Sequence, residues 1–329
     1  MGGYNPNSVT VEGCFFQTPP NLYPDSPATA VEHFRNNFIV GYLNSPITVD
    51  GKLENNYHFN DGSTTVLVAA QNEFVIDGAI FDSTVTANSG AITGPYEPGS
   101  LMTFSVKNSL SLAGATTGGY SALVNDHYSA NSHWTITNNT INVGEVEGII
   151  IGGENVAGTY PLIQDNVVFA DAGTSGTSFI HDSAGDAVNG TVTAADHNGC
   201  YNITTPYSVH AAGVFHTTPG TGDISSNPNF VGGTRCLARW SETILGHTGT
   251  DAQLCTSALL TLNDMNYGAG ADYHAGVSVE DLLTWVKAGY APQLAAYNTA
   301  GHAGGYIGAV IPVLPVTVTD VPMLLMAAL

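Results

Sequence analysis

Carboxylates and a histidine gather in one polar stretch between apolar runs, Ile180-His181-Asp182-Ser183-Ala184-Gly185-Asp186, and Asp196 follows soon after. Two carboxylates about 5–10 Å apart can hydrolyse a glycosidic bond, one as acid and the other as nucleophile or base. Loops between regular elements commonly hold such residues. His181, Asp182, Asp186 and Asp196 are therefore our candidate catalytic residues, although Asp, Ser and Gly are also ordinary residues of solvated turns.

Weaker groupings of acidic residues and histidine occur earlier in the chain. They are Asp126 and His127 with His133, and the set Glu145, Glu147 and Glu154. Neighbouring strands of a parallel stack lie about 4.8 Å apart, so carboxylates from successive repeats can pair on one face. A solvated turn is the simpler interpretation of each group.

Aromatic residues provide a second kind of candidate site. Tyr120, Tyr128, Trp134 and Tyr160 fall in the stretch before the carboxylates. Amphipathic rings suit a surface with one apolar and one wet side, such as a sugar-binding face. These four are our candidate glycan-binding residues. The alternative is that the rings belong to the core or to the flanks of the repeats.

Histidines are frequent, with 11 against 6 Lys and Arg. A zinc site needs three or four converging ligands, and no two histidines have the spacing of one helix face. His210 and His216 can approach His181 or His197 from neighbouring repeats, but we interpret the histidines as surface residues. No D-x-D-x-D-G loop occurs, so we expect no metal and no other cofactor. Calcium would fit only where Asp side chains and turn carbonyls converge.

The four cysteines, Cys14, Cys200, Cys236 and Cys255, form no C-x-x-C pair. A zinc ribbon or a thioredoxin-like site is therefore unsupported. Cys236 and Cys255 flank a short stretch that a disulfide can bridge, and free buried cysteines are an equally good interpretation. P-loop, dinucleotide-binding and G-x-S-x-G motifs are also lacking from the sequence.

The chain is acidic and poor in charge. Its 27 Asp and Glu against 6 Lys and Arg give a formal charge of −21, although only 10% of its 329 residues are charged. Nucleic acids and anionic membranes require a positive surface, so we expect neither as a partner. No uninterrupted apolar run is long enough to span a bilayer.

A short phrase recurs along the chain: an apolar residue, one or two polar residues, a turn pair and further apolar residues. Its turn anchors are spaced 24, 19, 22, 61, 27 and 32 residues apart, at Gly13, Asn37, Asn56, Gly78, Asn139, Asn166 and Asn198. A period of about 20–30 residues indicates stacked repeats. Short β-branched and aromatic runs between Asn, Asp and Gly indicate strands and tight turns.

The repeats make two structural predictions. Asn side chains at the corners are expected to stack from coil to coil and to bond the backbone of the next coil, and the gap of 61 residues is expected to hold two or three coils. The phrases also place Phe16, Phe59, Phe81 and Phe169 at equivalent, buried positions.

The Asn-Asn, Asp-Gly and Asp-Asn corners resemble those of the pectate-lyase-like β-helix superfamily, which includes phage tailspikes. Residues 226–231 are similar to a closing phrase of many such domains, with Asn227 where Asp is usual, and residues 304–309 are similar to their terminal phrase, again without the Asp. The resemblance covers about residues 9–310 and implies an all-β, right-handed parallel β-helix solenoid. It implies no single chemistry, because this fold hosts lyases, hydrolases, esterases, adhesins and inert spikes. Lyases of this fold use Arg or Lys beside a uronate, and the six scattered cations disfavour that reaction.

One helix is predicted over residues 278–289, with Ser278 as N-cap and an apolar stripe of Val279, Leu282, Leu283 and Val286. We expect it to pack on the end or flank of the solenoid, over the last coils, and residues 304–310 to return as a final strand. The predicted segments are a tag or disordered start over 1–8, β-helix coils over 9–235, a closing region over 236–310 and an apolar, Pro-containing tail over 311–329.

Two functions from different classes fit this sequence. The first is a non-enzymatic extracellular or virion-surface β-helix protein, of the spike, fibre or adhesin type, that contacts a polysaccharide or a cell-surface glycan. The alternative is a polysaccharide-degrading glycoside hydrolase with paired carboxylates on the β-helix flank. Val9–Val11 already has a strand pattern, so we expect either a homo-oligomer such as a trimer or the continuation of a longer chain.

Overall fold

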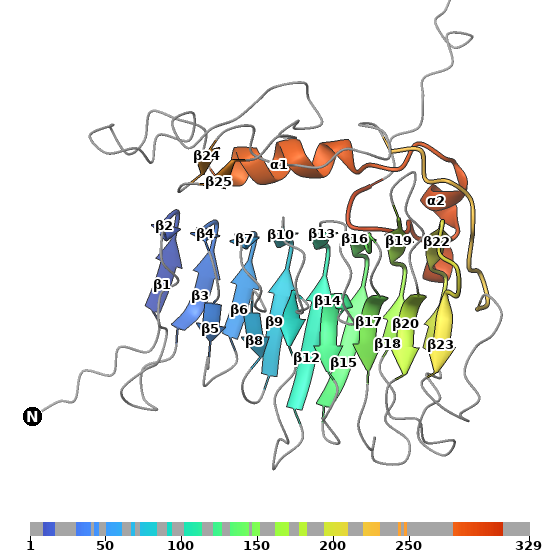
Figure 1. The fold of residues 1–329 in the computed structure, drawn as a ribbon, viewed down its shortest axis with the longest axis horizontal. Coiled ribbons are helices and arrows are strands. Elements are labelled where there is room, and N and C mark those ends of the chain that lie inside the picture. The colour runs from blue at the N-terminus through green and yellow to red at the C-terminus, as the bar shows by residue number, and fades with distance from the viewer. Residues whose placement is uncertain are drawn as a thin grey trace, which may run out of the picture.

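A computed structural model shows an all-β chain of three parallel sheets with a short helical segment near the C-terminus (Figure 1). The described residues are 9–16, 31–40, 43–45, 51–60, 67–69, 73–83, 91–93, 102–113, 121–126, 132–144, 147–151, 162–170, 178–182, 194–209, 220–230, 243–244, 247–248 and 279–311.

The strands of each sheet are neighbours in the order in which they occur along the chain. Sheet A contains β1 (Val9–Glu12), β3 (Val31–Arg35), β6 (Gly51–Glu54), β9 (Glu73–Asp77), β12 (Met102–Lys107), β15 (Ser132–Thr137), β18 (Leu162–Gln164) and β21 (Ala194–Asp196). Sheet B contains β2 (Phe15–Phe16), β4 (Phe38–Val40), β7 (Tyr57–Asn60), β10 (Ile80–Ser83), β13 (Leu110–Ala113), β16 (Thr140–Asn142), β19 (Val167–Phe169) and β22 (Gly199–Tyr201). Sheet C contains β5 (Leu43–Ser45), β8 (Leu67–Ala69), β11 (Ile92–Thr93), β14 (Ser121–Asp126), β17 (Glu147–Ile151), β20 (Ser178–Asp182) and β23 (Tyr207–Val209).

From β3 onward the chain passes through sheets A, B and C in that order, and we call each such passage a coil. The remaining elements follow the parallel sheets. They are an antiparallel pair, β24 (Thr243–Ile244) and β25 (His247–Thr248), then α1 (Val279–Gly289), α2 (Ala296–Thr299) and the 3₁₀ turn η1 (His302–Gly304).

Two residues join each strand of sheet A to the next strand of sheet B, and the first of them has a left-handed backbone. These first corner residues are Gly13, Asn36, Asn55, Gly78, Asn108, Asn138, Asp165 and His197. Gly and Asn adopt this conformation most readily, which explains why they recur at the turns. The 61-residue gap in the predicted anchors contains one further corner, Asn108-Ser109, so it spans two coils.

The second corner residue of most coils is a buried asparagine that bonds to the next coil. Asn166 Oδ1 accepts from both the backbone N–H and the side-chain amide of Asn139, at 2.9 and 3.0 Å. The Asn166 amide in turn donates to Asn198 Oδ1 at 3.1 Å and to the Ile136 carbonyl at 2.9 Å. Asn37 and Asn56 repeat the arrangement in earlier coils. The predicted stacking of corner asparagines is confirmed.

The predicted column of phenylalanines is wrong by one residue in two coils. In sheet B, Phe16 pairs with Ile39, Ile39 with His58, and His58 with Phe81. Phe59 instead pairs with Asp82, and Phe169 lies beside Asn142. Because side chains alternate across a strand, this one-residue offset places Phe59 and Phe169 in the other set of positions. Phe81 and Phe169 are nevertheless both buried, on opposite faces of the sheet.

Helix α1 covers the outer face of sheet B. Val279, Leu283 and Val286 are buried in one cluster with sheet B residues that include Tyr57 and Ile80. The helix predicted over 278–289 is thus present, and three of its four stripe residues dock as expected, while the Leu282 side chain lies outside the described residues. Figure 1 shows α1 lying across several strands of sheet B, so it packs on the flank and not over the last coils.

The segment after α2 does not form the expected final strand. Residues 305–311 have neither helix nor strand structure and lie against sheet B. Their contacts explain this, because the Gly308 N–H donates to the Asp165 carbonyl at 2.7 Å and a Cβ at Gly308 would lie 2.9 Å from Val167. The close approach predicted for Gly308 is confirmed, at a backbone φ of 105°.

The asparagine ladder predicts a large effect for one buried amide. Replacing Asn166 with Ala leaves the Asn139 backbone N–H and the Ile136 carbonyl without their partners in a buried site. We expect the free energy of unfolding to fall by about 3 kcal/mol or more, since each unsatisfied buried group costs about 1–3 kcal/mol. Denaturant unfolding measures it. Asn298→Ala, at an exposed position of α2, is the control, and equal losses in the two variants would contradict the ladder.

The docking of α1 is tested by a charge on its buried face. Leu283 is 3% exposed and Thr284 beside it is exposed. Leu283→Asp should destabilise the protein by about 3 kcal/mol or more, because apolar burial is lost and a charge is buried. Thr284→Asp should change stability by at most about 0.5 kcal/mol. If both variants melt at the wild-type temperature, α1 does not cover sheet B.

Candidate functional site

The predicted catalytic residues fall on different sheets. His181 and Asp182 end β20 in sheet C, while Asp196 ends β21 in sheet A. Asp186 and the side chains of His181 and Asp182 lie outside the described residues. Strand pairing therefore does not bring Asp182 beside Asp196, although both belong to the same stretch of sequence.

Register in sheet C does align two acidic residues from different coils. Asp126 of β14 pairs with Ile151 of β17, and Ile151 pairs with Asp182 of β20. Two strand spacings separate the backbones of Asp126 and Asp182, which is roughly 10 Å. Of the third acidic group, Glu147 pairs with Ser178, and burial raises the pKa of its carboxyl; Glu145 and Glu154 lie outside the described residues.

Trp134 is a core residue and not a stacking platform for sugars. Its side chain is 3% exposed, and its ring stacks on Phe104 with centroids 4.6 Å apart. Sequence reasoning had left this alternative open, and the pairing of β12 with β15 explains it. Tyr120, Tyr128 and Tyr160 lie outside the described residues.

Asp196 instead joins two histidines at the last corner between sheets A and B. Asp196 Oδ1 lies 3.1 Å from Nδ1 of His197, and the Gln164 amide donates to the same oxygen at 2.6 Å. The ring of His302 meets the ring of His197 edge to face, with centroids 5.3 Å apart. One ligand atom from each of Asp196, His197 and His302 lies within 4.8 Å of the others. We call these three residues the corner cluster.

Asp165 holds the loop that brings His302 to this corner. Asp165 Oδ1 accepts the backbone N–H of His302 at 2.6 Å, and its carbonyl accepts the N–H of Gly308. Burial raises the pKa of the Asp165 carboxyl, against the opposing effect of its hydrogen bond from His302 and the two nearby imidazoles. Asp165 thus holds the segment after α2 at two points, His302 and Gly308.

Sequence reasoning found Asp196 and noted His197, but it missed Asp165 and His302. Asp165 and His302 are 137 residues apart, and no local pattern connects them. One signal was available in the corner phrases, because Asp165 and His197 stand where the other corners from Gly13 to Asn138 have Gly or Asn.

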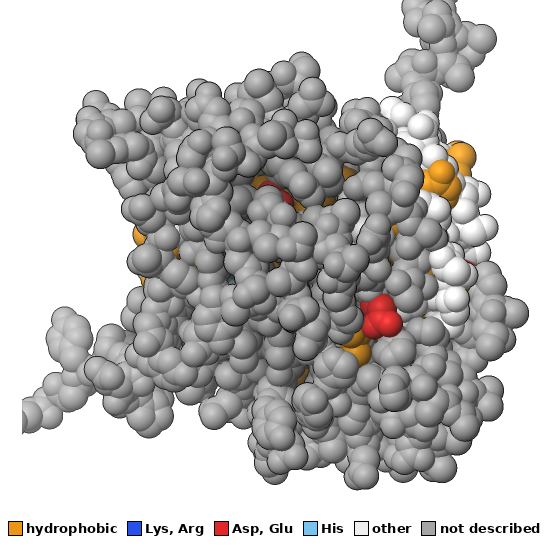
Figure 2. Space-filling view, viewed as in Figure 1, with side chains coloured by type: hydrophobic (Ala, Val, Ile, Leu, Met, Phe, Trp, Pro, Cys, Tyr) orange, Lys and Arg blue, Asp and Glu red, His pale blue; other side chains and the backbone are white. Residues whose placement is uncertain are grey.

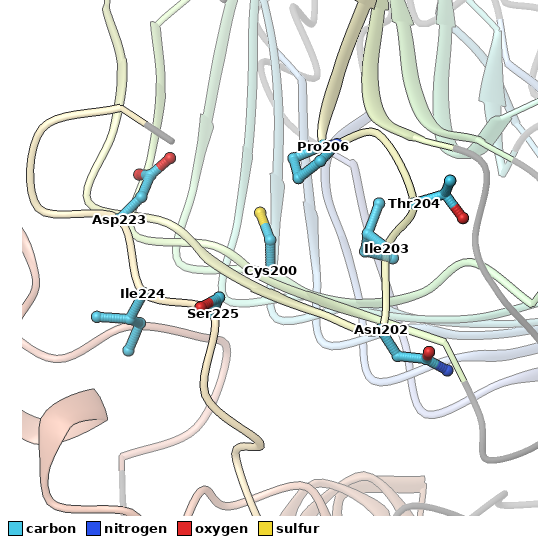
Figure 3. Close-up of a pocket in the computed structure, with 8 residues that line it drawn as sticks. All are labelled: Cys200, Asn202, Ile203, Thr204, Pro206, Asp223, Ile224 and Ser225. Atoms are coloured by element: carbon cyan, nitrogen blue, oxygen red, sulfur yellow. The ribbon is translucent and has the colours of Figure 1, made fainter. Parts of the chain in front are cut away.

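A cavity of about 230 Å³ opens beside the last described coil (Figure 3). Its lining includes Cys200, Ile203, Pro206 and Asp223. Burial raises the pKa of the Cys200 thiol, with a further contribution from nearby Asp223. A thiol held protonated in this way is a poor nucleophile. Cys200 and Cys14 are both free thiols, and Cys236 and Cys255 lie outside the described residues.

Asp223 ends the asparagine ladder and borders this cavity. Asp223 Oδ1 accepts the Asn198 N–H at 2.7 Å, and Oδ2 accepts both the Gly220 N–H and the Tyr207 hydroxyl. Burial raises the pKa of the Asp223 carboxyl despite these hydrogen bonds. The hydrogen bonds of Asp223 therefore close the asparagine ladder at the edge of this cavity.

Three basic side chains of the described part make contacts within the chain, whereas Lys52 is exposed. Arg35 pairs with Glu12 at 2.9 Å, Lys107 pairs with Asp77 at 3.1 Å, and Lys287 donates to the Gly78 carbonyl at 2.6 Å. Figure 2 shows acidic side chains on one face and no Lys or Arg side chain from the described residues there. In the described part of the chain, no helix is both long and apolar enough to cross a membrane.

A buried histidine lies in the interior away from these sites. His58 is fully buried between Ile39 and Phe81 in sheet B, and its ring stacks 5.0 Å from that of Phe81. Neither ring nitrogen has a hydrogen-bond partner among the described residues. Burial alone lowers the pKa of His58 to about 3.

This pKa shift predicts acid sensitivity. The unfolded chain binds a proton at His58 below about pH 6.5, whereas the folded chain resists it down to about pH 3, so stability falls as the pH drops through this window. The loss is about 1.4 kcal/mol per pH unit. Leu has a similar volume and no titrating group. Between pH 7 and pH 4.5, the free energy of unfolding of His58→Leu should therefore fall by about 3 kcal/mol less than that of the wild type. Denaturant unfolding at both pH values tests this, with Ile39→Leu as the control. The prediction is refuted if the unfolding free energy of His58→Leu depends on pH as steeply as that of the wild type.

Comparison with known proteins adds no relative: no family model matches the chain, and neither a curated protein nor a solved structure does so.

Proposed function

We propose that the three sheets form a right-handed parallel β-helix of the pectate-lyase-like type. Each coil contributes successive strands to sheets A, B and C, and same-sheet neighbours are parallel. Connections between parallel strands of one sheet are right-handed in about 98% of cases. The ladder of Asn37 and Asn56, resumed by Asn139, Asn166 and Asn198, supports the same stacking of coils.

On this fold we infer a non-enzymatic role, as a rigid spike, fibre or adhesin element outside a cell or on a virion, that contacts glycans. The carrying observation is that the described chain is a regular stack in which the candidate catalytic residues Asp182 and Asp196 fall on different sheets. A stack whose coils are joined by buried amides and three ladders of backbone hydrogen bonds is suited to a stiff, extended element.

A glycan hydrolase is the second candidate, because one observation favours it. Asp126 and Asp182 occupy one column of sheet C, with Ile151 between them. Their backbone separation of roughly 10 Å lies at the edge of the range of about 6.5–9.5 Å for the carboxyl groups of inverting glycosidases. Against it, Ile151 packs in the core cluster, so this column belongs to the interior set of positions at that coil.

Reducing-sugar release from a panel of polysaccharides separates the two functions. We expect the intact chain to release no more sugar than a variant carrying Asp126→Asn and Asp182→Asn, or than the control Glu280→Gln on the exposed face of α1. Cosedimentation with insoluble polysaccharides, measured on the same panel, tests glycan contact.

Each outcome decides one part of the proposal. Retention of the protein by a polysaccharide without sugar release supports a glycan-binding rod. A lack of both supports a rod and removes the glycan from the proposal. Sugar release that the double variant abolishes and Glu280→Gln keeps would replace the rod with the hydrolase.

A further inference from the structure

The corner cluster departs from the rule that the other corners follow. From Gly13 to Asn138, all six left-handed corner residues are Gly or Asn, and at the next two the chain has Asp165 and His197. An L-residue in this conformation carries a steric cost that Asn tolerates well, so His197 has no advantage as a corner residue. Asp165 has a structural role, because it holds the His302 backbone. At His197 the local rule is broken without such a gain, which is typical of functional sites.

The loop after α2 is built to bring a third side chain to the same place. The Gly301 N–H donates to the Gly305 carbonyl at 2.8 Å, and the Gly304 N–H donates back to the Gly301 carbonyl at 2.9 Å. Ala303 and Gly304 have left-handed backbones within this tight loop. The hydrogen bond from His302 N to Asp165 Oδ1 fixes the loop on the corner, which leaves the His302 imidazole beside His197.

The three ligand atoms are close to metal-binding geometry. They lie within 4.8 Å of one another, whereas bonds of about 2.0–2.1 Å in a tetrahedral zinc site place ligand atoms about 3.3 Å apart. Asp196 and His197 already meet at 3.1 Å, and the third ligand comes from His302, whose side chain is exposed.

Neighbouring groups orient the ligands as the surroundings of a metal site do. The Gln164 amide donates to Asp196 Oδ1 at 2.6 Å and fixes the carboxylate, and the buried Nδ1 of His197 lies 3.1 Å from the same oxygen. Asp165 adds a second carboxylate close by and holds the His302 backbone. Removing a contact that orients a metal ligand typically lowers the metal affinity 10- to 100-fold.

We propose that Asp196, His197 and His302 form a binding site for a zinc-class divalent cation. Two imidazoles and one carboxylate suit zinc and similar first-row ions, whereas calcium and magnesium favour oxygen ligands alone. A tetrahedral ion bound here has a fourth position for water or for a group from a partner. The ion joins a corner of the stack to a loop more than 100 residues later in the sequence, and so clamps the C-terminal segment to sheet B. This inference does not depend on the proposed function.

Calorimetric titration of the full chain with zinc chloride, after treatment with a chelator and its removal, tests the site. We expect one strong site per chain. Zinc should raise the melting temperature of the chain, and calcium at equal concentration should not.

Two variants assign the site and a third controls for it. His197→Asn installs the residue that other corners use, so it should fold while losing a ligand; His302→Gln removes a ligand from an exposed position. Each should weaken zinc binding at least tenfold and abolish the rise in melting temperature. His133→Gln, a histidine of sheet A outside the cluster, should bind as wild type does.

Several results would overturn the proposal. They are a lack of zinc binding by the wild-type chain, binding that neither His197→Asn nor His302→Gln weakens, and calcium binding in preference to zinc. Loss of binding in His133→Gln equal to that in the cluster variants would also overturn it, since the signal would then come from histidines in general. The sugar-release assay has no bearing on these outcomes, so failure here leaves the function proposed above to its own test.

Discussion

The buried carboxamide at the corner between sheets A and B is the interaction on which the rest of the stack depends. An asparagine side chain both accepts and donates, so each one receives the backbone N–H of the preceding coil and returns a hydrogen bond to an earlier carbonyl, as Asn139, Asn166 and Asn198 do. This exchange works only when the coils are in register, which fixes where each strand of sheet A ends. Where the ladder closes, Asp223 serves because three donors converge on its two oxygens: the N–H groups of Asn198 and Gly220 and the Tyr207 hydroxyl.

The same corner creates a column of outward positions. The left-handed residue before the second corner residue is partly or fully exposed in every coil but that of Gly78, and where it is not glycine its side chain can contact other elements. In early coils these side chains bind neighbouring coils, as Asn36 does with Glu12 and Asn108 with Asp77. In later coils they bind the C-terminal segment, as Asn138 does with the Tyr306 carbonyl and Asp165 with His302. The C-terminal segment therefore docks along the later left-handed corner residues, and the corner cluster lies at the last of them, His197.

The corners and the helix could be predicted because their signals are local. Asn-Asn or Asp-Gly between apolar runs demands a tight turn, and the stripe from Val279 to Val286 has the period of a helix. The face on which Phe59 and Phe169 lie could not be predicted, since a two-residue corner allows either residue to be left-handed and a shift of one exchanges the faces. The contact between Asp165 and His302 was equally beyond local patterns, because it depends on where α1 lies. The segment from Gly304 to Val310 was predicted to return as a final strand against the last coils, whereas the Gly308 N–H donates to a corner residue, Asp165, and the Ile307 N–H to Tyr297.

The position of α1 follows from an asymmetry between the sheets. In sheet A the residues that alternate with buried Phe104, Val106, Trp134 and Ile136 are Thr103, Ser105, His133 and Thr135, which can face water. In sheet B the alternate positions are mostly apolar. One column holds Phe38, Tyr57, Ile80, Leu110, Thr140 and Val167, which without a cover would form a large and mainly apolar exposed face. Such a face requires a cover. The C-terminal segment supplies one, and the column shrinks to Gly199 where the ring of Tyr297 enters, since a Cβ there would lie 2.5 Å from that ring. Helix α1 thus covers the side of the stack formed by sheet B. The C-terminal segment that contains α1 is held to the stack by the hydrogen bond between Asp165 and His302, so an ion bound beside His302 would stabilise the packing of this whole segment.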